Sequence, residues 1–121
     1  MGSSKFESLG VVFVYIFKDG RIYGYKGELK HLLEDELLGR RIKERMIVDR
    51  FTTDGKPLKY LNVANNEGEI FNNILWLRES DSMRAAQLFI DNELLKIAEL
   101  RDDMERCGAR IEMLEKFMEG E

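Results

Sequence analysis

The chain has 121 residues, 44% of them hydrophobic and 35% charged, and its formal net charge is −4. This length predicts one domain with a modest hydrophobic core. The negative charge is concentrated in residues 80–121, where eleven acidic residues face six basic ones, whereas residues 1–79 carry twelve against thirteen. Binding along duplex nucleic acid requires a basic surface, so this distribution argues against a nucleic-acid partner.

Residues 11–17 are β-branched or aromatic throughout, which predicts a strand that is buried on both faces. Asp19 and Gly20 follow it, and this dipeptide accepts the positive φ angles of a tight hairpin turn. Residues 21–26 then predict a returning strand, with side chains alternating between two faces. The first part of the chain is therefore expected to be a β-hairpin.

Residues 28–38 carry leucines at helical spacing and acids between them, which predicts a short amphipathic helix that ends at Gly39. The only dense basic cluster follows this glycine. Its simplest interpretation is a solvated connector, and its alternative is a contact patch for an acidic partner protein. The patch would consist of Arg40, Arg41, Lys43 and Arg45.

Three further strands are predicted, over residues 46–51, 58–63 and 74–78. An Asp-Gly-Lys-Pro turn separates the first two, and a loop rich in Asn and Gly precedes the third. Together with the hairpin, these segments predict a small antiparallel sheet of four or five strands.

Residues 81–118 form the longest periodic stretch and predict a helix with Asp81 as its N-cap. Apolar residues recur there at alternating spacings of three and four, which is the a/d pattern of a coiled coil. Gly108 offers an alternative in which the helix breaks into two. The unbroken pattern across Gly108 favours one helix, about 57 Å long, that pairs with a partner helix. We name seven of these residues the a/d stripe: Ile97, Leu100, Met104, Cys107, Ile111, Leu114 and Met118.

A catalytic site is not predicted. His31 and Cys107 are the only histidine and the only cysteine, so the sequence does not supply the usual ligands of a zinc site. A nucleophile with a base in reach would require these two residues to meet from distant elements. No phosphate-binding glycine loop or dinucleotide fingerprint is present. The chain is therefore expected to be non-enzymatic, to bind no cofactor and to contain no membrane span. A single cysteine without a visible signal peptide predicts a cytoplasmic protein.

Binding residues are better candidates than catalytic ones. Arg106 and Arg110 are one helical turn apart, so both can face one ligand, and the planar donors of arginine suit phosphate or carboxylate. The simpler interpretation is that they pair with neighbouring acids. Aromatic and polar residues just before the helix and in its early turns complete the set, although a core role is the usual one for a tryptophan. The candidate ligand-binding residues are Trp76, Arg78, Asn92, Arg106 and Arg110.

Residues 61–73 (LNVANNEGEIFNN), residues 75–81 (LWLRESD) and the Lys-Asp-Gly turn at 18–20 resemble small accessory proteins carried by phages of Gram-positive bacteria. Such proteins often counter host antiviral defence. The Thoeris anti-defence sponges are similar in outline, with a small β-sheet followed by C-terminal helices. Those sponges bind cyclic ADP-ribose-type signals in pockets at a subunit interface. This resemblance implies an anionic nucleotide as ligand and the host cytosol as location, and it assigns no residue.

These observations predict an α+β fold. Residues 1–79 would form the small sheet with one short helix, and residues 80–121 the long helix, which oligomerises. The first functional hypothesis is a protein that sequesters an anionic nucleotide signal at the interface of a homo-oligomer. The alternative is an adaptor or inhibitor that binds a host defence protein directly, through its basic patch or its acidic helix.

Overall fold

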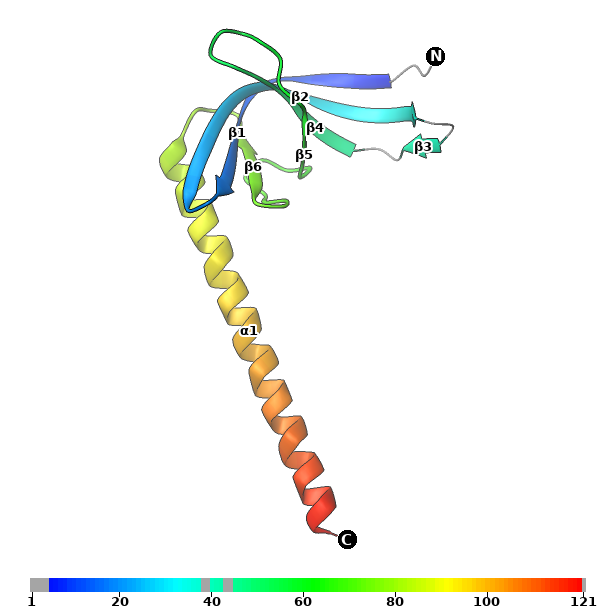
Figure 1. The fold of residues 1–121 in the computed structure, drawn as a ribbon, viewed down its shortest axis with the longest axis vertical. Helices are drawn as coiled ribbons and strands as arrows, with labels where there is room; N and C mark the ends of the chain where they lie inside the picture. Colours follow the sequence, from blue (N-terminus) through cyan, green and yellow to red (C-terminus); the bar gives the residue numbers. More distant parts are fainter. Residues whose placement is uncertain (1–4, 38–39, 43–44, 121) are drawn as a thin grey trace. The chain divides into compact units, whose positions relative to one another are not determined.

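The computed structural model of the chain describes residues 5–37, 40–42 and 45–120 (Figure 1). It is an α+β structure in which one long helix follows the strands in the sequence. The elements are β1 (Lys5–Lys18), β2 (Arg21–Leu37), β3 (Arg40–Ile42), β4 (Arg45–Phe51), β5 (Leu61–Val63), β6 (Ile74–Leu77) and α1 (Ser82–Glu119).

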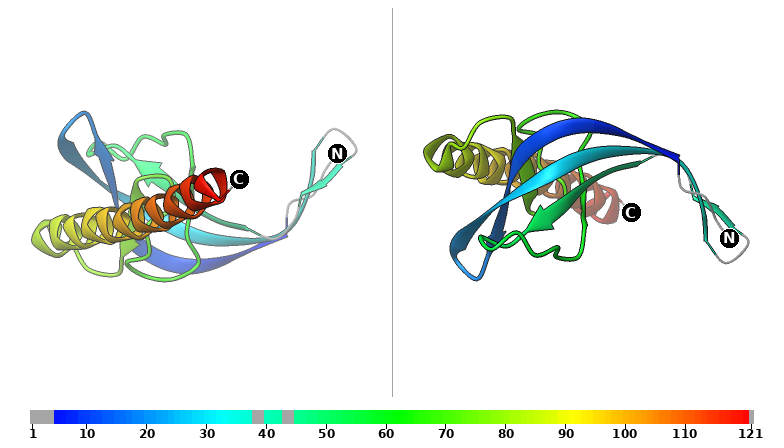
Figure 2. Two further views of the ribbon diagram at one scale, coloured as in Figure 1. Left: turned by 90° about the horizontal axis from the view of Figure 1, so that it is seen from below. Right: turned by 90° about the horizontal axis from the view of Figure 1, so that it is seen from above.

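Five strands lie side by side in the order β5-β4-β2-β1-β6, and every neighbouring pair is antiparallel. The short strand β3 pairs only with the end of β2. The predicted hairpin is confirmed, and its strands β1 and β2 are longer than expected and strongly bent (Figure 2). Gly10 interrupts the β1–β2 register with a φ of 96°, a conformation that glycine adopts without strain.

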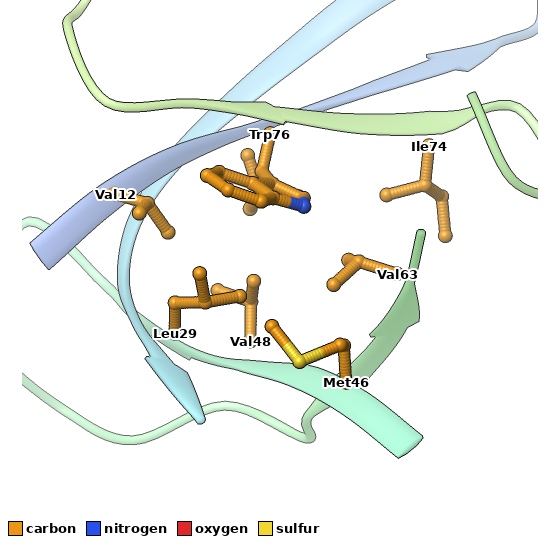
Figure 3. Packing of buried hydrophobic residues seen from close by; sticks show 8 residues of the cluster. Val12, Leu29, Met46, Val48, Val63, Ile74 and Trp76 are labelled. Carbon is orange, nitrogen blue, oxygen red and sulfur yellow. The ribbon is translucent and has the colours of Figure 1, made fainter. Parts of the chain in front are cut away.

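The curled sheet encloses a hydrophobic core on its inner face. Side chains from five strands meet there, and the ring of Trp76 points in among them (Figure 3). Alternate residues of each strand supply this core, as expected when successive side chains point to opposite faces. The fully buried or nearly buried members are Val12, Val14, Leu29, Met46, Val48, Val63, Ile74 and Trp76.

A second, smaller core covers the outer face of β1 and β6. Tyr15, Leu75 and Leu77 point to this face, and Ala85 and Phe89 from the first turns of α1 pack against them. The backbone N–H of Asp81, the residue just before α1, donates a hydrogen bond to the Tyr15 hydroxyl at 2.8 Å. The start of the helix is therefore fixed to the sheet by both packing and a hydrogen bond.

Helix α1 confirms the predicted long helix and its cap. The Asp81 carboxylate accepts a hydrogen bond from the backbone N–H of Arg84 at 2.9 Å, as an N-cap residue does. The helix continues through Gly108 without a break. The chain divides into two compact units, residues 1–89 and residues 90–121, so the first turns of α1 belong to the unit that contains the sheet.

The predicted short helix at residues 28–38 is wrong, because residues up to Leu37 belong to β2. Residues 26–32 of β2 pair with β1 on one side and with β4 on the other. Ladders on both sides satisfy the backbone N–H and C=O groups, and this tertiary pairing overrides the helical spacing of the leucines. Residues 38 and 39, including the predicted helix-ending glycine, lie outside the described part.

The remaining strand predictions are confirmed with shorter or shifted limits. The strand predicted at 46–51 is β4, and the one at 74–78 is β6. Of the strand predicted at 58–63, only Leu61–Val63 is a ladder strand. The residues before β5 make only isolated contacts with β4. The Arg50 carbonyl accepts a hydrogen bond from the backbone N–H of Leu58, and the Arg50 side chain donates to the Lys59 carbonyl.

Candidate ligand-binding groove

A groove of about 580 Å³ lies at the mouth of the curled sheet, where the inner core ends. Ligand pockets often occur in the mouths of β-barrels, so the position of the groove fits a small-molecule site. The groove is lined by residues of β1, β2, β4, β5 and β6, by the turn between β1 and β2, and by the turn before β6. They are Ile16, Phe17, Lys18, Asp19, Tyr23, Tyr25, Arg50, Leu61, Asn72, Asn73 and Ile74.

The floor of the groove is apolar and continuous with the core. Ile16, Tyr25 and Leu61 are half-buried and pack against the core residues, and Ile74 is itself a core residue. Tyr23 lies two residues before Tyr25 on β2, so its side chain is on the same face of the strand. Two tyrosines and three aliphatic side chains therefore offer a surface on which a flat ring can stack.

Arg50 is the cation of the groove whose position is most firmly fixed. It follows Met46 and Val48 on the inner face of β4, and its guanidinium lies 4.8 Å from the centre of the Tyr25 ring. Its Nε and Nη2 groups donate hydrogen bonds to the Lys59 carbonyl at 3.2 and 3.1 Å. These contacts leave Nη1 for a ligand, and none of the described carboxylates forms an ion pair with Arg50.

Asn72 and Asn73 form one rim of the groove. Both residues have positive φ angles, of 53° and 62°, and the backbones of Phe71 and Ile74 on either side exchange two hydrogen bonds. This is the geometry of a two-residue hairpin turn, in which asparagine is favoured because it tolerates positive φ. The Asn73 carbonyl also accepts a hydrogen bond from Phe17. Neither amide side chain bonds another described residue, so both remain for a ligand.

The turn between β1 and β2 adjoins this rim, because Phe17 bonds Asn73, and it contributes Lys18 and Asp19 to the groove. Asp19 has a φ of 54° and Gly20 a φ of 72°, as the Asp-Gly sequence predicted. The charged residues of the groove are thus two cations and one carboxylate. With two tyrosines and two amides, this set suits a planar ligand that carries negative charge.

Trp76 and Arg78 lie outside this groove. The Trp76 side chain is 4% exposed, and its indole N–H donates to the Ala64 carbonyl at 2.9 Å. Its surroundings are those of a core residue, which was the simpler interpretation. The Arg78 guanidinium lies 5.3 Å from the Trp76 ring and donates to the Leu9 carbonyl, so it is engaged in joining β6 to β1.

The other three candidates lie on the part of α1 in the second unit. Asn92 is half-buried, and Arg106 and Arg110 are exposed. Arg106 is 3.8 Å from Asp103, which matches the simpler interpretation of pairing with a neighbouring acid. Asn92 and Arg106 are separated by fourteen residues, or about 21 Å of helix, too far to contact one small ligand together.

The predicted basic patch coincides with β3 and the start of β4. Arg40 and Arg41 lie in β3, whose backbone pairs with β2, and Lys43 lies outside the described residues. Arg45 is the first residue of β4, where its guanidinium lies 5.4 Å from the centre of the Tyr60 ring and donates to the Tyr60 hydroxyl at 3.3 Å.

The residues of the groove were not predicted from the sequence as ligand contacts. One signal was available: the Asn72-Asn73 pair interrupts an apolar run, and such a pair is typical of a turn with two positive φ angles. Arg50 gave no signal, because its role depends on the curl that brings β4 opposite β1 and β6. His31, predicted on a helix, pairs with Met46 in the β2–β4 ladder.

Comparison of the chain with protein-family models, with curated proteins and with solved structures found no match. Among the described residues, no three or more His, Cys, Asp or Glu side chains gather where they could hold a metal ion. Over that same part of the chain, no helix has the length and apolar character needed to cross a membrane.

Proposed function

We propose that this chain is a non-enzymatic binding protein that captures a small anionic ligand of the nucleotide class in the groove at the mouth of its sheet. The observation that carries the proposal is Arg50. Its guanidinium is held by Tyr25 and by the Lys59 carbonyl, lines the groove, and has no carboxylate partner among the described residues. A cation that the fold positions without neutralising is available to bind an anion.

The other lining residues suit the remaining parts of a nucleotide. A base can stack on the exposed ring of Tyr23, since aromatic side chains bind bases by their faces. The Asn72 and Asn73 amides offer both donors and acceptors to a base edge or a sugar hydroxyl. Lys18 adds a second cation that can bind phosphate. The Asp19 carboxylate repels any further phosphate groups. The groove therefore favours a ligand with few phosphates over a polyanion.

The biological role that we propose is sequestration of a nucleotide signal. The resemblance to phage accessory proteins supports this use, because a protein that binds a defence signal without converting it lowers the signal's free concentration. The site assigned here is in the sheet unit and needs only one copy of the chain. It replaces the earlier hypothesis of a pocket built from Trp76 and the helix arginines at an oligomer interface.

Calorimetric titration at low salt tests the proposal, with ADP-ribose, cyclic ADP-ribose and cyclic di-AMP as probes. Loss of hydrogen bonds to a charged group costs about 1.5–3 kcal/mol, so Arg50→Ala should weaken binding roughly 10- to 100-fold. Arg50→Lys should recover only part of this loss, because an ammonium lacks the planar, paired donors. Arg84→Ala is the matched control, since it removes the same charge from an exposed position outside the groove.

Backbone amide shifts in NMR spectra locate the site independently, and should change at Tyr23, Asn72 and Asn73. Native mass spectrometry of the purified chain shows whether a ligand is retained. The proposal fails if no probe binds and no adduct is retained, or if Arg50→Ala and Arg84→Ala bind equally. Stoichiometric capture of a host protein that is unaffected by Arg50→Ala would instead favour the adaptor hypothesis.

A further inference from the structure

The a/d stripe of α1 is exposed in the single chain. Its six large apolar members are between 48% and 75% exposed, and Cys107 is an exposed free thiol. An exposed apolar surface of this extent marks an interaction site. The alternating spacing of three and four matches the period of a two-helix coiled coil, so the surface fits another helix better than a sheet or a flat surface.

The area agrees with a stable dimer of this helix. A fully buried aliphatic side chain removes roughly 60–120 Å² from water. The six stripe residues between positions 97 and 114 on each of two copies would bury about 700–1,400 Å², which overlaps the lower end of standard protein interfaces. A second copy of the chain supplies the same stripe with the same period, so it satisfies the geometric requirement without any other partner.

We propose that two copies of the chain pair through residues 97–114 of α1 as an antiparallel coiled coil, with its two-fold axis between residues 105 and 106. In antiparallel coiled coils an a residue of one helix faces a d residue of the other. Each flanking e position faces an e position of the other helix, and each g position faces a g position. The proposed register pairs Ile97 with Leu114, Leu100 with Ile111 and Met104 with Cys107 of the second copy.

Charge complementarity selects this register. The g positions are Lys96, Asp103, Arg110 and Phe117, and the e positions are Leu94, Arg101, Gly108 and Glu115. In the proposed register Asp103 faces Arg110 of the second copy, and the symmetry repeats this opposite-charge pair. No like charges face each other at the e or g positions. Flanking charges of this kind set partner orientation and register in coiled coils.

The neighbouring arrangements each bring like charges together. If one helix slides by one heptad so that the two-fold axis moves toward the N-terminus, Asp103 faces Asp103 and Arg101 faces Arg101. If one helix slides by one heptad so that the axis moves toward the C-terminus, Arg110 faces Arg110, although Arg101 then faces Glu115. A parallel dimer places Lys96 opposite Arg101, which offsets its Arg110–Glu115 pair, and it aligns the two helix dipoles. Only the proposed register combines an opposite-charge pair with no like-charge pair at these flanking positions, so the flanking charges favour it.

In the antiparallel arrangement, residue 90 of one copy and residue 90 of the other would be roughly 45 Å apart along the helix axis. Each copy carries its own groove, so the dimer would be bivalent toward a partner that offers two ligands. This inference concerns the helix alone and does not depend on the ligand proposed for the groove.

Disulfide trapping tests the orientation directly. A double variant, Met104→Cys with Cys107→Ala, is mixed with the unmodified chain and oxidised, and each protein is also oxidised alone. In the proposed register the thiol introduced at position 104 lies opposite Cys107 of the unmodified copy, so the mixed dimer should form fastest. Identical positions are offset by about 4.5 Å along the axis, which disfavours a disulfide between them. In a parallel dimer the identical positions would crosslink instead.

Trypsin resolves the products, because cleavage after Arg106 separates position 104 from position 107. Mass spectrometry of the linked peptides should therefore find mainly the 104–107 product. In the mixture, more 107–107 product than 104–107 product would overturn the orientation. A monomer in analytical ultracentrifugation at concentrations of about 100 µM would overturn the dimer itself.

A charge-reversal series gives a second measurement that needs no cysteine. Asp103→Arg should weaken the dimer at least several-fold by placing like charges together, and so should Arg110→Asp. Combining the two should restore the dissociation constant to within about twofold of the original. In a parallel dimer Asp103 faces Gly108 and Arg110 faces Glu115, so the combination would not restore it. Failure of the restoration would overturn the proposed register.

Discussion

Gly27 lies in β2 opposite Arg50 of β4, at a point where the two strands leave no room for a side chain. A Cβ atom at this position would be 2.5 Å from the Asp49 carbonyl oxygen and 2.5 Å from a Val48 methyl carbon. Real Cβ atoms do not approach other atoms so closely, so one strand has to move. Asp49 and its neighbours are fixed in the β2–β4 ladder, and Val48 is fully buried in the core.

Gly27→Ala should therefore destabilise the sheet unit strongly. Overpacking a well-packed site typically costs 1–3 kcal/mol, and a clash with backbone belongs at the upper end of that range. About 3 kcal/mol is a large part of the 5–15 kcal/mol that stabilises a typical domain. For a unit of this size, such a loss corresponds to a decrease in Tm of roughly 12–24 °C.

Urea denaturation followed by tryptophan fluorescence measures this loss, because Trp76 is the only tryptophan and is buried in the same core. Gly24→Ala is the matched control on the same strand. A Cβ at Gly24 would meet only the Tyr15 ring, at 3.3 Å, and a ring can shift by the few tenths of an ångström required. The reasoning is refuted if the two variants differ by less than about 0.5 kcal/mol, the usual spread of neutral substitutions.

Two further predictions concern the helix cap and the alkaline pH range. Asp81→Ala should lower the free energy of unfolding by about 1 kcal/mol because it removes the N-cap, whereas Asp81→Asn should lower it by only about a few tenths. Urea denaturation measures both losses, and equal losses would argue against capping. The Asp49 carboxylate, 2.6 Å from the Lys30 ammonium, raises the pKa of that ammonium above its ordinary value of 10.5. The resulting stability is fully present below pH 10.5 and is lost as the pH rises through the raised pKa. Asp49→Asn should therefore flatten the decline in stability above pH 10.5, and a decline of unchanged slope would contradict the assignment.

Local patterns were sufficient where the physical cause is local. The Asp19-Gly20 turn forms because these two residues accept positive φ, and the cap at Asp81 forms because its carboxylate reaches the N–H of the third helical residue. The period of the long helix depends only on the spacing of its own side chains. Each of these features was therefore predictable from a short window of sequence.

The tertiary structure decided the features that depend on distant partners. Leu29 and Leu32 have helical spacing, but β1 and β4 pair with their strand on both sides and fix it as extended. The sequence left Trp76 open as a ligand contact, although a core role is the usual one, and the curl of the sheet places it in the core. Arg50 lines a groove only because that curl brings β4 and β5 opposite β1 and β6. Sequence patterns therefore predicted the Asp19-Gly20 turn, the cap and the long helix. Burial and the groove required the long-range strand pairing, because only that pairing sets which residues far apart in the sequence become neighbours.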